Sequence, residues 1–169
     1  TGPMYEIYNC ILHQRGEDPL WNKFQHNCFP NTLCAIVSAI QKIGAFTPVN
    51  LDEKLYRGNG GSQYLPSSFF DRDDMNVRGM APFGFQSFTA SIDSLEYAQP
   101  DGEKKLPMVF VLQPSSDPLA GFADVSGFSQ YPKEREFLLP PLAFLTPDST
   151  CKSYQHESPK YGNVNFVPM

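Results

Sequence analysis

Two glutamates, Glu134 and Glu136, stand directly before an apolar run that ends at Pro140 and Pro141. Carboxylates accept protons from attacking groups and stabilise positive charge that develops in a transition state. Residues i and i+2 of a strand point to the same face, so a strand at this position would project both carboxylates together. Charged residues usually lie exposed, so a solvated strand face is the simplest alternative explanation.

Two other segments carry polar side chains suited to a ligand that contains phosphate. Arg57 opens the glycine-rich stretch 58–61, and glycine lets a backbone approach a ligand closely. A guanidinium at the edge of such a turn binds phosphate oxygens through its forked N–H groups. Ser87 and Thr89 place hydroxyls at alternate positions of a predicted strand, so both face one side. Each segment by itself is weak evidence for a site.

In chain order, these segments resemble the R-S-E signature of mono-ADP-ribosyltransferases, a family with bacterial toxins, vertebrate arginine-specific enzymes and protist members. The resemblance rests on Leu55–Gly58, Gly84–Thr89 and Gln130–Pro141, and it extends over about residues 5–146. The stretch that begins Ser129-Gln-Tyr-Pro is most similar to the protist and toxin-like members. The resemblance implies an ADP-ribosyltransferase-like fold, with N-terminal helices followed by a two-sheet β-sandwich core and an NAD cleft.

The same resemblance implies a role for each glutamate. NAD is the substrate in this family, and nicotinamide is the leaving group. Breaking the bond between nicotinamide and ribose builds positive charge on the ribose, as in glycoside hydrolysis. Glu136 matches the residue that stabilises this charge and holds the ribose 2′-hydroxyl. Glu134 matches the residue that orients or deprotonates the acceptor.

The other matched positions are implied to bind NAD or to support catalysis. Arg57 matches the residue that steadies the phosphates and the nicotinamide ribose. The backbone of Gly58 matches a position that hydrogen-bonds the nicotinamide amide. Ser87 matches the serine that positions the catalytic glutamate and the ribose, and Thr89 supports the same strand. Arg57, Ser87, Glu134 and Glu136 are therefore the candidate catalytic residues, and no metal is expected.

The sequence departs from the family pattern at Phe88, which takes the middle position of the usual Ser-Thr-Ser. Phe88 lies on the strand face opposite Ser87, which favours packing in the core. Phe85 is a candidate for stacking on the nicotinamide ring, although a place in the core suits it as well. Arg72 and Arg78 are further candidates for phosphate contacts, and their loop position favours solvent exposure as the alternative.

We therefore expect a mono-ADP-ribosyltransferase that moves ADP-ribose from NAD to a protein acceptor, with arginine as the expected acceptor residue. A guanidinium is a poor nucleophile until a carboxylate orients it and helps to remove a proton. An NAD glycohydrolase would use water instead and would share every residue of the donor site. A non-catalytic binding module of the same fold is the alternative from another class, and the intact Arg57, Ser87 and Glu136 argue against it.

The arrangement of expected elements favours an α+β fold, because helices come first and strands follow. Apolar spacing and capping residues predict helices over 4–12, 20–28 and 30–44, the last one ending at Gly44. Strands are predicted over 54–57, 83–89, 107–112, 134–139 and 163–167, with 142–145 continuing the sheet, a loop over 62–80 and a polar turn over 98–106. A single catalytic domain is expected over 1–169, with residues 1–4 interpreted as a cloning remnant.

Composition narrows the classes of partner. The chain has 169 residues and a net charge of −5, and it lacks the clustered cations that nucleic acids require. No apolar stretch approaches the roughly 20 residues that span a bilayer, so no membrane partner is expected. Cys10, Cys28, Cys34 and Cys151 lack the paired spacing of a zinc site and are expected as thiols in a reducing cytosol. We expect a monomeric domain of a larger chain, either cytoplasmic or delivered as an effector into a host cytosol.

Overall fold

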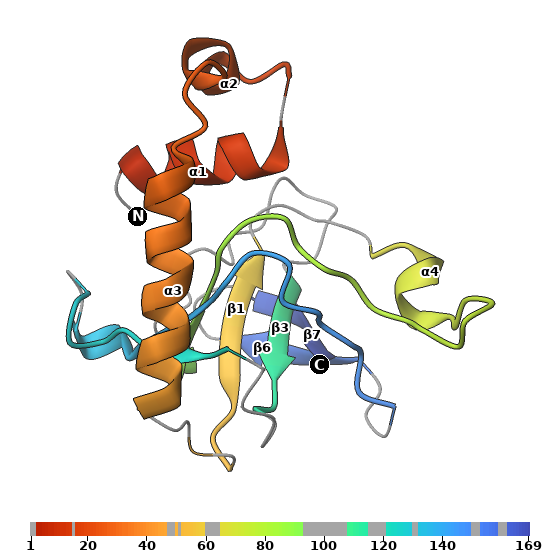
Figure 1. The fold of residues 1–169 in the computed structure, drawn as a ribbon. Coiled ribbons are helices and arrows are strands. Elements are labelled where there is room, and N and C mark those ends of the chain that lie inside the picture. The colour runs from red at the N-terminus through yellow and green to blue at the C-terminus, as the bar shows by residue number, and fades with distance from the viewer. Residues whose placement is uncertain are drawn as a thin grey trace.

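The computed structural model describes residues 3–14, 16–46, 50, 52–59, 65–92, 108–114, 121–129, 132–149, 153–158 and 162–169. Helices come first in the chain: α1 (Pro3–His13), α2 (Pro19–Phe24) and α3 (Pro30–Phe46). The strands follow as β1 (Leu55–Asn59), β2 (Gln86–Thr89), β3 (Met108–Leu112), β4 (Ala123–Asp124), β5 (Glu136–Leu139), β6 (Tyr154–Ser158) and β7 (Gly162–Pro168). A short helix, α4 (Ser67–Phe70), and a 3-10 turn, η3 (Pro132–Glu134), lie between strands. The order confirms the α+β prediction (Figure 1).

All seven strands belong to one sheet with the order β4-β5-β2-β1-β3-β7-β6. Strands β3 and β7 pair in parallel, and the other neighbours pair antiparallel. In the middle of the sheet, β1 and β2 are joined only through the pairing of Tyr56 with Thr89. By contrast, β1 and β3 pair from Leu55 to Asn59. A three-stranded part (β4, β5, β2) therefore meets a four-stranded part (β1, β3, β7, β6) at this junction. The expected two-sheet sandwich is not confirmed, because the junction makes the strands one sheet.

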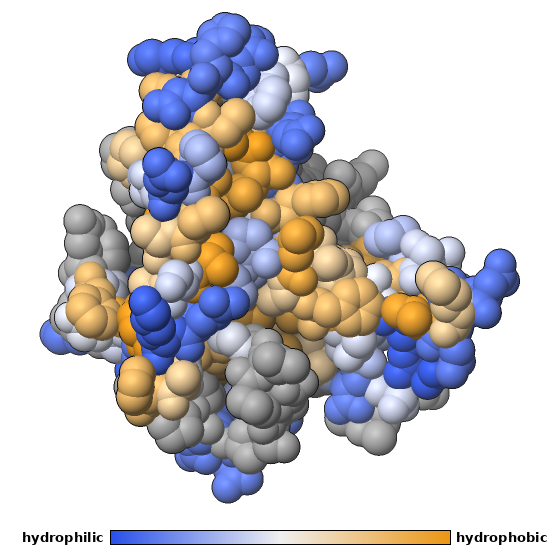
Figure 2. All heavy atoms as spheres, in the orientation of Figure 1, coloured by the Kyte–Doolittle hydropathy of each residue, from blue (hydrophilic) through white to orange (hydrophobic). Residues whose placement is uncertain are grey.

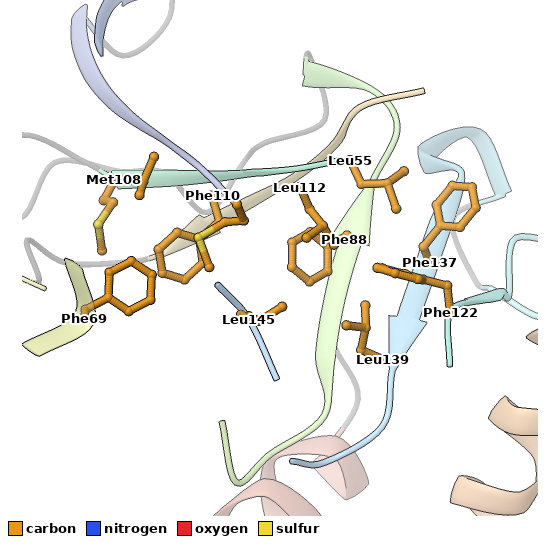
Figure 3. Close-up of a cluster of buried hydrophobic side chains, with 12 residues drawn as sticks. Leu55, Phe69, Phe88, Met108, Phe110, Leu112, Phe122, Phe137, Leu139 and Leu145 are labelled. Atoms are coloured by element: carbon orange, nitrogen blue, oxygen red, sulfur yellow. The ribbon is translucent and has the colours of Figure 1, made fainter. Parts of the chain in front are cut away.

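The main core lies between these two parts of the sheet. Leu55, Phe110 and Leu112 come from the four-stranded part, and Phe88 and Phe137 come from the three-stranded part. Figure 3 shows these side chains converging in one cluster. Phe88 is 1% exposed, which confirms the prediction that it packs in the core.

The helices cover the opposite face of the three-stranded part. Ile40 of α3 packs with Phe85 and Ala123, and half-buried residues of α1 and α3 surround them. The polar residues of this N-terminal region lie mainly over α2, where Figure 2 shows a hydrophilic surface above an apolar middle. Asp18 caps α2, since its Oδ1 accepts a 2.8 Å hydrogen bond from the backbone N–H of Leu20. Among the described helices, none is long and apolar enough to cross a membrane.

Several predicted boundaries were wrong, and the reasons are local. Strand β5 begins at Glu136 rather than at 134, because Arg135 has a φ of 46° and so leaves the extended conformation. Strand β2 begins at Gln86, and the expected loop 62–80 contains α4. Helix α2 ends at Phe24, and Leu145 forms an isolated bridge with Met80 instead of extending a strand over 142–145. Strand β6 was not predicted, and the turn expected at 98–106 lies outside the described residues.

Gly44 does not end α3, which continues to Phe46; instead it allows the helix to approach the sheet closely. A Cβ at this position would overlap the backbone carbonyl oxygen of Phe122 and lie 3.1 Å from its carbonyl carbon. A backbone carbonyl cannot rotate away as the end of a side chain can. The glycine is therefore required by the packing of α3 on the segment that leads into β4.

Gly44→Ala is expected to lower the free energy of unfolding by up to about 2 kcal/mol. Alanine in a helix interior is favoured over glycine by about 1 kcal/mol, whereas overpacking in a filled site costs about 1–3 kcal/mol. The overlap with Phe122 therefore outweighs the gain in helix propensity. Chemical denaturation measures the change, and Gly16→Ala is the matched control, because a Cβ at Gly16 meets nothing within 4 Å. A stabilised Gly44→Ala variant would contradict this account of the packing.

Candidate active site

Hydrogen bonds connect three of the predicted site residues in a line. The Nη1 of Arg57 donates a 2.9 Å hydrogen bond to the backbone carbonyl of Ser87. The hydroxyl of Ser87 donates a 2.6 Å hydrogen bond to Oε1 of Glu136. These residues lie on β1, β2 and β5, at the junction between the two parts of the sheet. The structure thus brings together a guanidinium, a hydroxyl and a carboxylate from segments that are distant in sequence.

Pairing between β2 and β5 fixes the geometry of this contact. Thr89 pairs with Glu136 and Ser87 pairs with Leu138, so these four side chains share the sheet face that the helices cover. Antiparallel partners lie directly opposite each other, which brings the neighbouring Ser87 hydroxyl within reach of the carboxylate. The predicted projection of Ser87 and Thr89 to one side is therefore confirmed.

Helix α1 holds the segment that leads into β2. Oδ1 of Asn9 accepts a 2.9 Å hydrogen bond from the backbone N–H of Phe85, and the hydroxyl of Tyr5 donates a 3.3 Å hydrogen bond to the carbonyl of Phe85. Residues four apart in a helix lie on the same face, so both side chains reach one residue of the strand entry. Gly84 packs close beside them, and a Cβ there would displace the side-chain ends of Asn9 and His13. Helix α1 therefore supports the position of Ser87 indirectly.

The second oxygen of the Glu136 carboxylate has a partner of its own. Oε2 of Glu136 accepts a 3.1 Å hydrogen bond from the hydroxyl of Ser129. Ser129 ends a turn in which Oδ1 of Asp124 accepts hydrogen bonds from the N–H and the hydroxyl of Ser126. These contacts form an Asx turn at Asp124. Two serines from different segments thus fix the carboxylate direction.

Donors without partners lie next to this line of residues. The Nε of Arg57 is buried and has no hydrogen-bond acceptor among the residues that the structure describes. The Nδ2 of Asn59, two residues further along β1, is also buried and has no acceptor among the described residues. A buried donor without an acceptor is costly, and both atoms have almost no accessible surface, so an acceptor oxygen from a ligand reaches them only when the neighbouring side chains move. Gly58 lies between the two donors on β1.

Glu134 is placed differently from its prediction. It belongs to η3 and not to β5, so the expected strand alternation with Glu136 is wrong. Its backbone carbonyl accepts a hydrogen bond from Oγ1 of Thr89, which ties η3 to the end of β2. Its side chain is half-buried and makes no hydrogen bond within the described part of the chain. The two glutamates therefore depend on different supports.

The remaining candidates have structural partners. Phe85 is 4% exposed and packs under the helices, so its ring is not available to stack on a ligand in this conformation. Nη1 of Arg72 binds the backbone and the side chain of Asn76, and Nη2 of Arg78 binds the carbonyl of Pro147. Within the described ranges, no three His, Cys, Asp or Glu side chains are grouped to hold a metal ion.

Sequence reasoning missed Ser129, Asn59 and the pair Tyr5 and Asn9. Ser129 directly precedes the segment Gln130–Pro141 that carries the family resemblance, so its position seven residues before Glu136 was a usable signal. Asn59 follows Arg57 at strand spacing, which was a weaker signal. The α1 residues gave none, because a helix and a strand about 80 residues apart meet only in the folded chain.

Comparisons with solved structures find proteins of similar fold. HopU1, an ADP-ribosyltransferase of Pseudomonas syringae pv. tomato, matches with a TM-score of 0.58 and 18% identity, over 99% of this chain and 66% of that chain. Vis toxin, an ADP-ribosyltransferase from Vibrio splendidus, matches with a TM-score of 0.57 and 17% identity, over 98% and 67%. Exoenzyme S from Pseudomonas aeruginosa, solved with human 14-3-3 protein beta and Carba-NAD, gives 0.55 and 16%, over 99% and 68%.

The chain therefore spans about two thirds of the length of each of these proteins. No protein-family model and no curated protein matches the sequence. At this level of identity, the common feature is the course of the chain over nearly the whole of its length. This chain has the fold of the ADP-ribosyltransferases.

Proposed function

We propose that this chain transfers ADP-ribose from NAD to a protein side chain and releases nicotinamide. The observation that carries the proposal is the hydrogen-bonded line from Arg57 through Ser87 to Glu136. The chain shares its fold with HopU1 and Vis toxin, which are ADP-ribosyltransferases, and with exoenzyme S, which was solved with Carba-NAD. A toxin-like mono-ADP-ribosyltransferase accounts for the fold and for the residue types together.

The donor half of the reaction uses Glu136. The bond between C1′ of the ribose and the nicotinamide nitrogen breaks, and its electron pair leaves with the nicotinamide. The Glu136 carboxylate stabilises the positive charge on the ribose and accepts a hydrogen bond from the 2′-hydroxyl. The short bond from Ser87 keeps the carboxylate oriented, so little reorganisation is needed when the charge develops.

The binding half of the site lies on β1. Arg57 places its guanidinium beside the Ser87 carbonyl and keeps a buried Nε without a partner in the described chain, which suits a phosphate or ribose oxygen. The backbone of Gly58 is assigned to the nicotinamide amide. Asn59 contributes a second unpartnered donor. Thr89 supports both halves, since it pairs with Glu136 and binds the carbonyl of Glu134.

Arginine is the proposed acceptor residue, and Glu134 is the proposed base. A nitrogen of the acceptor guanidinium attacks C1′ and forms the new C–N bond, while the Glu134 carboxylate takes the proton that leaves this nitrogen. The products are ADP-ribosyl-arginine, nicotinamide and one proton. The half-buried Glu134 carboxylate, which has no hydrogen bond within the described chain, is compatible with this role.

NAD hydrolysis is the second candidate, because one observation favours it. Glu134 lies in η3, outside the strand that holds Glu136, so the donor site is complete without it. If no acceptor is bound against Glu134, water attacks C1′ instead, and free ADP-ribose is the product. The protein acceptor remains part of the proposal. We also propose that residues 1–169 form a single catalytic domain.

Incubation with labelled NAD and a cell lysate tests the proposed function. Transfer attaches label to protein, and mass spectrometry identifies the modified residue, whereas hydrolysis releases label only as free ADP-ribose. Nicotinamide release without protein label would replace transfer by hydrolysis. If the chain released no nicotinamide at all, the enzymatic proposal would fail in both forms.

Ser129→Ala is expected to lower kcat for nicotinamide release by about fivefold, because a typical hydrogen bond contributes about 1 kcal/mol. The variant keeps the Ser87 contact but frees one oxygen of the Glu136 carboxylate. Ser126→Ala is the control, since the hydroxyl of Ser126 lies in the same turn and bonds Asp124 instead. Equal losses in the two variants would show that the turn as a whole matters, rather than the contact with Glu136.

A further inference from the structure

Arg135, the residue between the two glutamates, has an unusual backbone conformation. Its φ of 46° lies in the left-handed region, which is unfavourable for a residue with a side chain. Neither glycine nor asparagine stands here to ease the turn. Contacts elsewhere in the fold must therefore hold the conformation.

Arg135 makes those contacts through its side chain and through its backbone carbonyl. Its Nη1 and Nη2 lie 2.5 Å and 3.0 Å from Oε1 and Oε2 of Glu53, so guanidinium and carboxylate meet through two parallel bonds. Its guanidinium carbon lies 5.9 Å from the ring centroid of Phe137. Its backbone carbonyl accepts a 3.3 Å hydrogen bond from the N–H of Ala90.

Glu53 is itself anchored to the segment that carries Arg57. The N–H of Glu53 donates a 3.1 Å hydrogen bond to the carbonyl of Asn50, and the N–H of Asp52 donates one of 3.1 Å to Oδ1 of Asn50. This turn leads directly into β1. The ion pair therefore joins the start of β1 to the residue between the two glutamates, across 82 positions of the chain.

The conformation of Arg135 decides where Glu134 points. With an extended Arg135, Glu134 would continue β5 and project on the same face as Glu136. With a left-handed Arg135, Glu134 lies in η3 and is held there by Thr89. Glu136 is held separately by Ser87 and Ser129, so a change at Arg135 moves one carboxylate more than the other.

We propose that Arg135 is a positioning residue, which directs the Glu134 carboxylate through its ion pair with Glu53 and so sets the partition of ADP-ribose between acceptor and water. This inference rests on the proposed function of the same site. It assigns the specificity for the acceptor to a pair of residues that touch neither NAD nor the reacting atoms. The side chains of Arg135 and Glu53 are 53% and 20% exposed, so the pair is partly screened by solvent.

The test measures nicotinamide release and, in the same reaction, the ratio of ADP-ribosylated acceptor to free ADP-ribose. Agmatine serves as a small guanidine acceptor, with a cell lysate in parallel. Glu53→Gln is expected to lower the ratio by up to about fivefold, the upper end of the range for a partly exposed pair. Total nicotinamide release and KM for NAD should stay within about twofold, because the supports of Glu136 are intact.

Three further variants separate positioning from a general effect of charge. Arg135→Lys keeps the charge but loses the two parallel bonds, so the ratio should fall as in Glu53→Gln. The exchange Glu53→Arg with Arg135→Glu should restore part of the ratio. Lys133→Gln removes an exposed charge from η3 and should leave the ratio unchanged. Added salt should lower the ratio in the wild type more than in Glu53→Gln, because salt weakens exposed pairs.

The outcomes distinguish this inference from the proposed function. An unchanged ratio in Glu53→Gln, or an equal loss of nicotinamide release and ADP-ribosyl transfer, would overturn the role of Arg135. Nicotinamide release by the wild type would still support the enzymatic assignment. Wild-type release without any transfer to agmatine or to lysate protein would also overturn it. Melting temperatures of all variants exclude unfolding as the cause of a lowered ratio.

Discussion

Glu136→Gln is expected to abolish nicotinamide release and ADP-ribosyl transfer together, each by at least about a hundredfold. Glutamine keeps the shape of the side chain and still accepts the hydrogen bond from Ser87, but it carries no negative charge. The charge on the ribose then develops opposite a neutral amide. The measurement is steady-state nicotinamide release from NAD, with and without an acceptor.

Folding and binding controls belong to the same experiment. Glu6→Gln removes an exposed carboxylate from the first turn of α1 and should leave both activities unchanged. The melting temperature of Glu136→Gln should match that of the wild type, because the Ser87 contact persists. Normal nicotinamide release by Glu136→Gln would refute the whole assignment of the site, since no other carboxylate in the described chain is bonded to Ser87.

Glu134→Gln is expected to lower transfer to a guanidine acceptor by about a hundredfold, the usual range for the loss of a general base. Hydrolysis of NAD should stay within about threefold, because the proposed donor site of Arg57, Ser87 and Glu136 does not include Glu134. The measurement is the ratio of ADP-ribosylated agmatine to free ADP-ribose. The result separates the roles of the two carboxylates more directly than any change at the donor site.

Position also matters for Glu134, and an isosteric variant alone does not test it. Glu134→Asp keeps the charge and shortens the side chain by one methylene group, so it should impair transfer but leave hydrolysis intact. Parallel losses of transfer and hydrolysis in both Glu134 variants would contradict the division of labour. A single catalytic carboxylate would then serve both the cleavage of NAD and the activation of the acceptor.

Much of the fold was readable from the sequence where local patterns and burial agree. The apolar run of β3 is buried along its whole length, as predicted. The alternation across Ser87, Phe88 and Thr89 placed one ring in the core and two hydroxyls on the other face. The mixed α+β order also followed from composition and spacing, because helical and strand periodicities occupy different parts of the chain.

Element boundaries were less predictable, since tertiary contacts decide them. The sequence around Glu134 reads as a strand, but η3 and the left-handed Arg135 replace its first two residues. Gly44 reads as a helix end, but it lies inside α3 where the helix meets a backbone carbonyl. In both cases, a partner distant in sequence overrides the local preference.

The sequence by itself determined which groups are present and in what order: a guanidinium, a hydroxyl and two carboxylates. The alternation of side chains along each predicted strand also indicated which of them share a face. Only the tertiary structure decided that Ser129 and Ser87 share the Glu136 carboxylate, and that Glu53 pairs with the left-handed Arg135 next to Glu134. The physical reason is the range of the interactions. Strand alternation is set by the backbone geometry of neighbouring residues, whereas a hydrogen bond or an ion pair between distant segments forms only when the folded core brings them together.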